Sequence, residues 1–211
     1  MLGCIHILHM GDNMKLFWCP QTRALRVLWM IEELGVKYDL VRTDISADED
    51  GNRAELLTAS PMGKVPAIID GDVRMSESAA ICIYLADKYA GGKLAPAIDD
   101  ADRGSFLYWM FYVPGVVEPA MAEKFSGSEV NKISHGWGDF DSMISTLEQG
   151  LTNKDWVLGD SFSAADVMLG STCYFLKKFG ILPENKQLES YVDRCMARPA
   201  YQKALAIDEA G

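Results

Sequence analysis

The sequence has few of the residues that build metal sites and disulfide frameworks. Its 211 residues include three histidines and five cysteines, and the cysteines are scattered, with no CxxC spacing and no Cys/His cluster. This pattern argues against a zinc site and fits a reduced, cytoplasmic protein better than a disulfide-bonded one. We therefore expect no metal cofactor and a cytoplasmic location. The cysteines are Cys4, Cys19, Cys82, Cys173 and Cys195.

The chain also lacks a basic surface pattern and a long apolar run, and these absences exclude two classes of binding partner. The 30 acidic residues outnumber the 20 basic residues, which gives a formal net charge of −10. Because the chain has no basic stripe that could displace counterions from a phosphate backbone, we expect no nucleic acid partner. No apolar run reaches the ~20 residues that a membrane span needs, so we expect no membrane partner either.

Residues 1–14 do not continue the pattern of strands and helices that follows them. They carry no basic n-region and only a short apolar patch, which argues against a secretory signal. Met14 stands directly before residues 15–18, where a first strand would start. We predict that Met14 is the natural start and that residues 1–14 are a disordered leader, in which His6 and His9 are inert.

The next part of the chain alternates between strand and helix patterns. Residues 15–18 are typical of a buried strand, residues 24–34 of a helix with one apolar face, and residues 38–42 of a second strand. This order implies a parallel pair of strands with a right-handed crossover. Together with a strand at Pro66, a hairpin and a helix, it predicts an α/β domain over residues 15–90 with the order β-α-β-α-β-β-α, a thioredoxin-like layout.

The second half of the chain has a helical pattern throughout. The clearest break in composition is AGGKLAP, and we place a linker at residues 91–100. Strand alternation ends there, which predicts an all-α helical-bundle domain over residues 101–211. Ser163 and Asp166 have the spacing of a capping box, with Asp in place of the usual Glu or Gln, and open its central core helix. Predicted helices cover residues 101–112, with a bend or break at Pro114-Gly115, then residues 130–151, and residues 164–175.

The most informative stretch is residues 60–89, SPMGKVPAIIDGDVRMSESAAICIYLADKY. Pro66 cannot donate to a sheet ladder, and only an X-Pro bond adopts the cis form at low cost. Asp70-Gly71 predicts a tight hairpin. Glu77 and Ser78 then precede a largely apolar helix, whose N-terminus favours a bound carboxylate, while the acid at Glu77 suits an ammonium group. The stretch therefore offers backbone pairing, carboxylate binding and amine binding close together.

This combination closely resembles the glutathione-binding half of cytosolic glutathione transferases of the bacterial and fungal type. The family pattern of Gly-x-Val/Ile-Pro, hairpin and Glu-Ser is matched at Gly63, Val65, Pro66, Glu77 and Ser78. The resemblance implies that the backbone of Val65, next to Pro66, pairs with the cysteinyl part of glutathione. It also implies that Glu77 and Ser78 hold the γ-glutamyl group, that glutathione is the co-substrate, and that the protein is a homodimer.

Other positions agree with the same family. Its members carry a Ser/Thr-x-x-Asp box at the place of Ser163 and Asp166, so the likeness extends into the second half of the chain. Lys64 would reach the glycyl carboxylate of glutathione.

The chemistry that the resemblance implies is activation of the glutathione thiol. A free thiol with a pKa of about 8.5 is mostly protonated at neutral pH, and lowering its pKa by about two units requires roughly 2.7 kcal/mol. A helix dipole provides about 0.3–1 kcal/mol. Hydrogen bonds to the charged sulfur, at about 1.5–3 kcal/mol each, must supply the rest. We expect the donor in the turn at residues 19–23, which faces a helix N-terminus.

This turn leaves two alternatives. Cys19-Pro20 is similar to the start of the helix in omega-like, glutaredoxin-related transferases, which implies a mixed disulfide on Cys19 and thiol transfer or deglutathionylation. Thr22-Arg23 stands where many bacterial and fungal relatives carry Ser-Arg. There the Thr22 hydroxyl would donate to the thiolate and Arg23 would add positive charge. The longer match, over residues 22–29, favours conjugation of glutathione to a small hydrophobic electrophile.

The electrophile is expected between the two domains, opposite the turn. Tyr108, Phe111 and Tyr112 lie at spacings of three and four on the aromatic-rich helix, and we predict them as substrate contacts. A non-catalytic binding protein with the same fold is a further alternative. Glu77 and Ser78 argue against it, because a scaffold does not need a clamp for the γ-glutamyl group.

Overall fold

The computed structural model describes residues 13–46, 51–127 and 131–211. The predicted leader lies outside these residues except for its last two, and Met14 belongs to the first strand, where it is buried.

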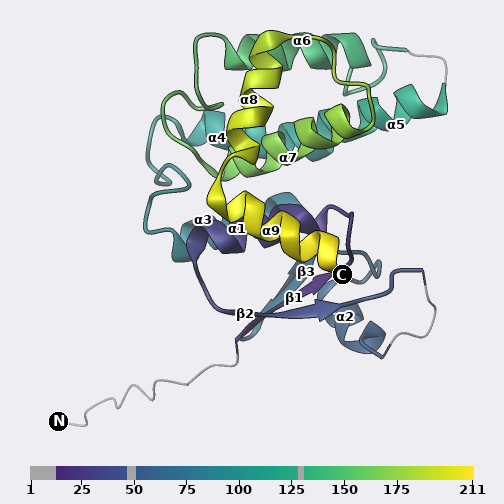
Figure 1. Cartoon of the computed structure of the whole chain (residues 1–211), viewed down its shortest axis with the longest axis vertical. Helices are drawn as coiled ribbons and strands as arrows, with labels where there is room; N and C mark the ends of the chain where they lie inside the picture. Colours follow the sequence, from purple (N-terminus) through teal and green to yellow (C-terminus); the bar gives the residue numbers. More distant parts are fainter. Residues whose placement is uncertain (1–12, 47–50, 128–130) are drawn as a thin grey trace.

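A four-stranded mixed sheet organises the N-terminal half of the chain (Figure 1). Its strand order is β2-β1-β3-β4, in which β1 pairs parallel with β2 and antiparallel with β3, and β3 pairs antiparallel with β4. The hairpin between β3 and β4 turns at Gly71, whose φ of 61° matches the positive φ expected there. The strands are β1 (Met14–Trp18), β2 (Tyr38–Arg42), β3 (Ala67–Asp70) and β4 (Val73–Ser76).

Three helices cover the two faces of this sheet. Figure 1 shows α1 and α3 on the face toward the C-terminal helices and α2 on the opposite face. Helix α1 is buried along most of its length because its apolar residues face both the sheet and the helical half. Gly35 ends it with a φ of 63° and donates its N–H to the carbonyl of Ile31. The helices are α1 (Ala24–Leu34), α2 (Arg53–Ala59) and α3 (Ser78–Tyr89), which confirms the thioredoxin-like order.

The C-terminal half is helical, as predicted, and differs from the prediction in one helix start. The α-helix is interrupted at Pro114 and Gly115, as predicted, and the interruption is a wider π-helical turn, which accommodates a proline that has no N–H to donate. The helix predicted from residue 130 begins only at Phe140, after Asp139 caps it by accepting the N–H of Ser142. The elements are α4 (Arg103–Tyr112), the π turn η1 (Val113–Val117), α5 (Glu118–Ser126), α6 (Phe140–Leu151), α7 (Ala164–Lys178), α8 (Lys186–Met196) and α9 (Pro199–Ala210).

Helix α7 runs through the centre of the helical half. The predicted capping box is present: the Ser163 hydroxyl accepts from the start of α7, and the Asp166 carboxylate accepts the N–H of Ser163 at 2.9 Å. Asp166 also accepts from the N–H of Val157 and the hydroxyl of Tyr191. Burial raises the pKa of the Asp166 carboxyl to about 6, although these hydrogen bonds act in the opposite direction.

The two halves share one hydrophobic core. Trp29 of α1 makes an edge-to-face contact with Tyr201 of α9, with ring centroids 5.0 Å apart, and lies 5.8 Å from Phe162. Figure 1 shows α9 lying along α1, between the sheet and the other C-terminal helices. Among the residues described, no helix is both long enough and apolar enough to cross a membrane.

Candidate functional site

The turn between β1 and α1 holds Thr22 in a well-defined position. Its hydroxyl donates to the carbonyl oxygen of Cys19 at 2.7 Å and accepts the N–H of Ala24 at 3.2 Å. Gln21, just before it, has a φ of 57°, which is unusual for a residue with a side chain. The Thr22 hydroxyl therefore acts as a helix cap. It can donate to another acceptor only by turning away from the Cys19 carbonyl.

Cys19 differs from the other cysteines that the structure describes. Its side chain is partly exposed, whereas Cys82, Cys173 and Cys195 are buried. Burial raises the pKa of Cys82 and of Cys173 to about 12, and raises that of Cys195 well above its usual value. Within the described part of the chain, Cys19 is therefore the thiol best placed for chemistry with a ligand.

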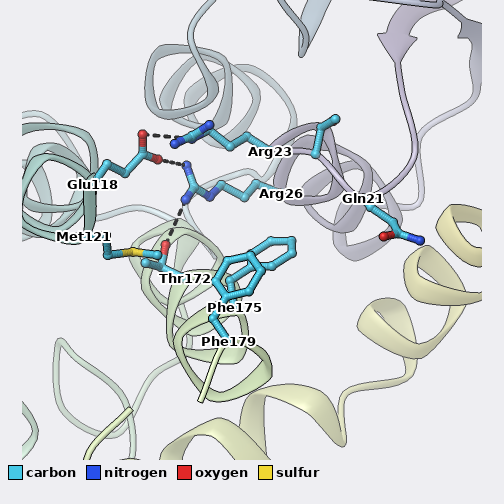
Figure 2. Close-up of a pocket in the computed structure, with 9 residues that line it drawn as sticks. Gln21, Arg23, Arg26, Glu118, Met121, Thr172, Phe175 and Phe179 are labelled. Atoms are coloured by element: carbon cyan, nitrogen blue, oxygen red, sulfur yellow. Dashed lines mark hydrogen bonds and ion pairs between the residues drawn. The ribbon is translucent and has the colours of Figure 1, made fainter. Parts of the chain in front are cut away.

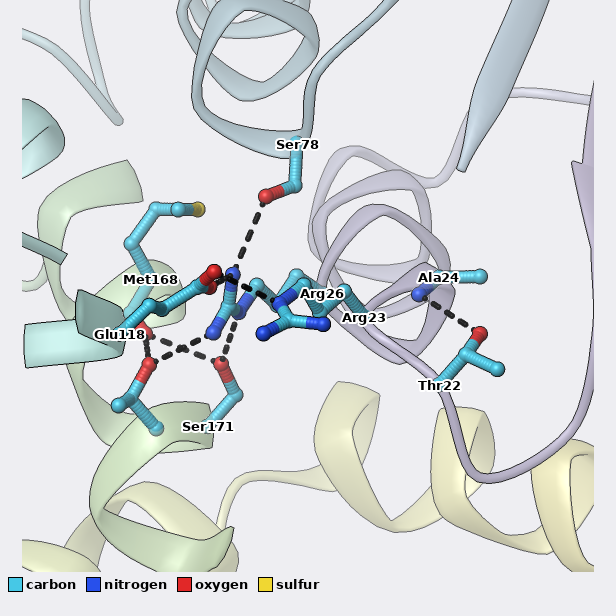
Figure 3. A network of polar contacts seen from close by, with 9 residues as sticks. Thr22, Arg23, Ala24, Arg26, Ser78, Glu118, Met168 and Ser171 are labelled. Carbon is cyan, nitrogen blue, oxygen red and sulfur yellow. Dashed lines mark hydrogen bonds and ion pairs between the residues drawn. The ribbon is translucent and has the colours of Figure 1, made fainter. Parts of the chain in front are cut away.

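A buried arginine lies directly behind the turn (Figure 3). Arg26 of α1 is 3% exposed, and its Nη1 donates to Glu118 Oε1 at 2.7 Å and to the Ser78 hydroxyl at 3.2 Å. Its other nitrogens donate to the hydroxyls of Ser171 and Thr172 on α7. This cluster joins α1, α3, α5 and α7 at one point between the two halves.

Glu118 connects the arginine cluster to the surface. One oxygen pairs with Arg26, and the other pairs with Arg23 Nε at 2.8 Å. Burial works to raise the pKa of Glu118, but the charge of Arg26 and the hydrogen bonds from both arginines outweigh it and hold the pKa below 4.5. Burial also lowers the pKa of Arg26, against the effect of Glu118.

The residues predicted to bind glutathione lie at the edge of the sheet and the start of α3. The Val65-Pro66 peptide is cis, and Pro66 directly precedes β3, which starts at Ala67. The backbone groups of Val65 have no hydrogen-bond partner among the described residues. Lys64 is exposed, and its N–H donates to the hydroxyl of Ser60 at 3.0 Å.

Glu77 and Ser78 stand together at the N-terminus of α3. Glu77 is exposed and has φ 74° and ψ 110°, an unfavourable conformation for a residue with a side chain. Ser78 is buried and starts the helix. Because Ser78 accepts a hydrogen bond from Arg26, its own O–H is free to point elsewhere. Helix N-H groups, an exposed carboxylate and a hydroxyl donor therefore lie side by side.

A pocket opens next to the turn, between the two halves (Figure 2). Its volume is about 130 Å³. Thr22 lies on one side, with Met121 of α5 and Phe175 of α7 among the apolar residues around it. Cys19 is not part of the lining in the described structure. The lining residues are Gln21, Thr22, Arg23, Arg26, Glu118, Met121, Thr172, Phe175 and Phe179.

The aromatic residues predicted to contact the electrophile lie outside this pocket in the described structure. Tyr108 and Phe111 on α4 are 50% and 58% exposed. Tyr112 is buried, and its hydroxyl donates to the carbonyl of Met143. The apolar part of the pocket comes instead from Met121, Phe175 and Phe179.

Sequence reasoning also missed Arg53 of α2. Its guanidinium lies against Gly63, and Nη1 donates weakly to the Gly63 carbonyl at 3.4 Å. It therefore places a second cation beside Lys64. Phe175 and Phe179 could have been found from their i, i+4 spacing at the end of α7, but such a pair is more often core. No group of His, Cys, Asp or Glu within the described ranges is arranged to hold a metal ion.

Comparison with known proteins agrees with this geometry. Residues 12–87 match the family model for the glutathione S-transferase N-terminal domain, and residues 118–194 match that for the C-terminal domain. Glutathione S-transferase hmp2 of Hypomyces subiculosus is 30% identical over 179 residues, which cover 79% of this chain and 84% of that protein. The chain belongs to the glutathione S-transferase family.

Two further relatives of this transferase carry different names. The structure of a sphingomonad glutathione S-transferase complexed with glutathione superposes with a TM-score of 0.79 at 26% identity, covering 93% of this chain and all of the other. The disulfide-bond oxidoreductase YfcG of Escherichia coli is 26% identical over 165 residues, covering 72% of this chain and 75% of that protein. The family thus includes proteins named for different reactions.

Proposed function

We propose that this transferase conjugates glutathione to a small apolar electrophile and that Thr22 is the hydrogen-bond donor to the thiolate. One observation carries the proposal: Thr22 lines the pocket between the halves, together with Met121, Phe175 and Phe179, whereas Cys19 does not. Thr22 and this apolar wall border the same space. Conjugation needs this arrangement, because the sulfur and the electrophile must meet there.

Glutathione would enter from the sheet side of the pocket. The Val65 backbone would pair with its cysteinyl part, and Glu77 and Ser78 would hold the γ-glutamyl amine and carboxylate. Lys64 would face the glycyl carboxylate. This orientation brings the thiol toward the N-terminus of α1, where the helix dipole favours negative charge.

Thr22 would then exchange its hydrogen bond to the Cys19 carbonyl for one to the sulfur. A hydrogen bond to a charged acceptor contributes about 1.5–3 kcal/mol, enough for much of the required fall in the thiol pKa. Arg23 would add positive charge, reduced by its ion pair with Glu118. The thiol proton leaves to water, and the thiolate attacks the electrophile held against Met121, Phe175 and Phe179.

Replacing Thr22 by Val tests this mechanism, because Val keeps the shape and removes the hydroxyl. We expect kcat/KM for a generic aryl halide to fall by roughly 10- to 100-fold, equivalent to the loss of one charged hydrogen bond. Thr58→Val, on the exposed face of α2, is the control. Conjugation at the parental rate by Thr22→Val would show that another group activates the thiol.

The alternative chemistry is thiol transfer through Cys19, favoured by its partial exposure and by the relative named as a disulfide-bond oxidoreductase. Here the Cys19 thiolate would attack a glutathionyl disulfide and form a mixed disulfide, which a second glutathione would resolve. Cys19→Ser would then lose disulfide reduction and keep conjugation. Measuring conjugation and disulfide reduction for Thr22→Val and for Cys19→Ser shows which of the two residues handles the thiol.

Two further parts of the proposal concern the state of the protein. We propose a homodimer in the cytoplasm. Light scattering gives the mass in solution, and a mass of one chain would contradict the dimer.

A further inference from the structure

Asp208 lies near the end of α9, yet it contacts the turn that carries Thr22. Its Oδ1 accepts from the indole Nε1 of Trp18 at 2.9 Å, and its Oδ2 accepts the backbone N–H of Gln21 at 3.0 Å. Asp208 is 4% exposed and Trp18 is 2% exposed. One buried carboxylate therefore joins the end of β1 to the middle of the turn.

The contact to Gln21 falls on the residue of the turn that has a positive φ. A φ of 57° places Gln21 in the left-handed region, which a residue with a Cβ occupies only where its surroundings fix it. The hydrogen bond from its N–H to Asp208 is such a constraint. Thr22 follows directly in the chain, so the conformation of Gln21 sets the place of the Thr22 hydroxyl.

The C-terminal residue after α9 makes further contacts with the N-terminal half. Gly211 sits directly against the Trp18 ring, and its carbonyl accepts from Arg42 Nη2 at 3.1 Å. The segment that carries Asp208 is thus attached to β1 through Trp18 and to β2 through Arg42, which limits how far Asp208 can follow a shift of the turn.

We propose that Asp208 is a positioning residue, which holds the turn so that the Thr22 hydroxyl meets the glutathione thiol. This inference rests on the proposed role of Thr22. If the contact is lost, Gln21 can relax toward a common backbone conformation and carry Thr22 with it. A displacement of about 1 Å in a reacting group can cost up to 100-fold in rate.

The proposal predicts a separation between binding and chemistry. Glu77 and Ser78 lie at the N-terminus of α3, and Asp208 makes no hydrogen bond to them in the described structure. Glutathione affinity should therefore survive a change at Asp208, while the thiol pKa and kcat should not. A substitution at Asp208 leaves the charged residues that line the pocket unchanged, namely Arg23, Arg26 and Glu118.

Asp208→Asn is the decisive variant, because it keeps the volume and leaves only one acceptor oxygen for two donors. We expect the Kd for glutathione, measured by calorimetry, to change by less than about threefold, and kcat at neutral pH to fall roughly tenfold. The thiolate absorbance of bound glutathione should titrate at higher pH, so that kcat recovers in alkali. Glu209→Gln, at an exposed neighbouring position, should match the parent.

Two companion variants keep the test decisive. Trp18→Phe removes the bond to Oδ1, together with part of the buried ring that packs on Gly211, and leaves the bond from Gln21 to Oδ2 in place. It should shift the thiol titration in the same direction by less, and it replaces Asp208→Asn if that variant does not fold. An unchanged titration and kcat in the folded variants would overturn the positioning role. Thr22→Val in the same assays separates the two proposals: no effect there refutes the proposed function, and an effect there without one at Asp208 refutes this inference alone.

Discussion

At the scale of single residues, Arg26 and Glu118 form the ion pair that is most deeply placed in the site. Arg26 is 3% exposed and Glu118 is 19% exposed at the side chain, and Nη1 and Oε1 are 2.7 Å apart. Three hydroxyls accept further hydrogen bonds from Arg26. Removing a guanidinium from water is costly, so the ion pair adds little net stability by itself. Removing one partner, however, leaves the other charge buried without compensation, and that is strongly destabilising.

We therefore expect Glu118→Gln to destabilise the protein by about 3 kcal/mol, measured by urea denaturation. Arg23→Gln is the matched control, because it removes the other cation from the same carboxylate at a site whose side chain is 59% exposed. It should cost less than about 1 kcal/mol. Equal losses in the two variants would mean that Arg26 is compensated by its hydroxyl partners alone.

The same pair should make stability depend on pH. The pKa of Glu118 is lower in the folded protein than its ordinary value of 4.5, so the folded state holds the proton less tightly than the unfolded state. The stabilisation is therefore present above pH 4.5 and is lost as the pH falls below it, through the folded pKa. Urea titrations of the parent and of Glu118→Gln should converge as the solution is acidified, and a constant difference in their free energies of unfolding would contradict this.

At the scale of elements, the start of α7 depends on one carboxylate with four donors. Asp166 accepts from the N–H of Val157, the N–H and hydroxyl of Ser163, and the hydroxyl of Tyr191. These bonds fix the helix start, the loop before it and α8 together. The capping box is therefore part of a junction between three segments.

We expect Asp166→Asn to destabilise the protein by about 2–4 kcal/mol, because an amide has one acceptor oxygen and leaves buried donors without partners. Ser163→Ala removes the cap and one of the four donors to Asp166, and it should cost about 1 kcal/mol. Far-UV circular dichroism during urea denaturation measures both. If Ser163→Ala cost as much as Asp166→Asn, the contacts to Val157 and Tyr191 would contribute nothing.

The same elements show which features can be predicted from sequence. The strand-helix order, the turn at Gly71 and the capping box of Ser163 and Asp166 follow from signals within a few residues, and the structure confirms them. The helix predicted from residue 130 starts ten residues later, at Phe140, where Asp139 caps it. Helix boundaries respond to capping contacts more than to periodicity.

The candidate site was harder to predict because it is assembled from distant segments. The sequence motif for glutathione binding lies within one short stretch and could be recognised from sequence; it includes Val65, Glu77 and Ser78. The pocket, in contrast, brings Thr22 together with Phe175 of α7 and with Phe179 just after that helix. Asp208 is 190 positions from its partner Trp18, and no local pattern connects them.

At the scale of the whole molecule, the two halves share one continuous core. Trp29 contacts Tyr201 and Phe162, and α9 returns from the helical half to lie on α1. The sheet therefore loses packing partners if the helices unfold. We regard the chain as one cooperative unit, in which a ligand bound at the sheet edge stabilises all of the elements that pack around α1.

Glutathione binding should accordingly shift the entire thermal transition. At a glutathione concentration of about 100 times its Kd, mass action adds about 2.7 kcal/mol of stability. For a chain of this size the Tm should rise by roughly 5–10 °C, and tryptophan fluorescence and far-UV circular dichroism should report the same shift. Different shifts by the two probes would mean that the halves unfold separately.

Glu77→Gln decides whether this shift comes from the predicted γ-glutamyl clamp. The side chain is exposed and makes no capping hydrogen bond, so its loss should leave the Tm without ligand unchanged. With the charge to the amine removed, we expect glutathione affinity to fall about tenfold, which halves the stabilisation at the same concentration. Glu189→Gln, at an exposed position on α8, should behave as the parent. A parental shift in Glu77→Gln would place the amine of glutathione elsewhere, and the strained backbone at Glu77 would need another explanation.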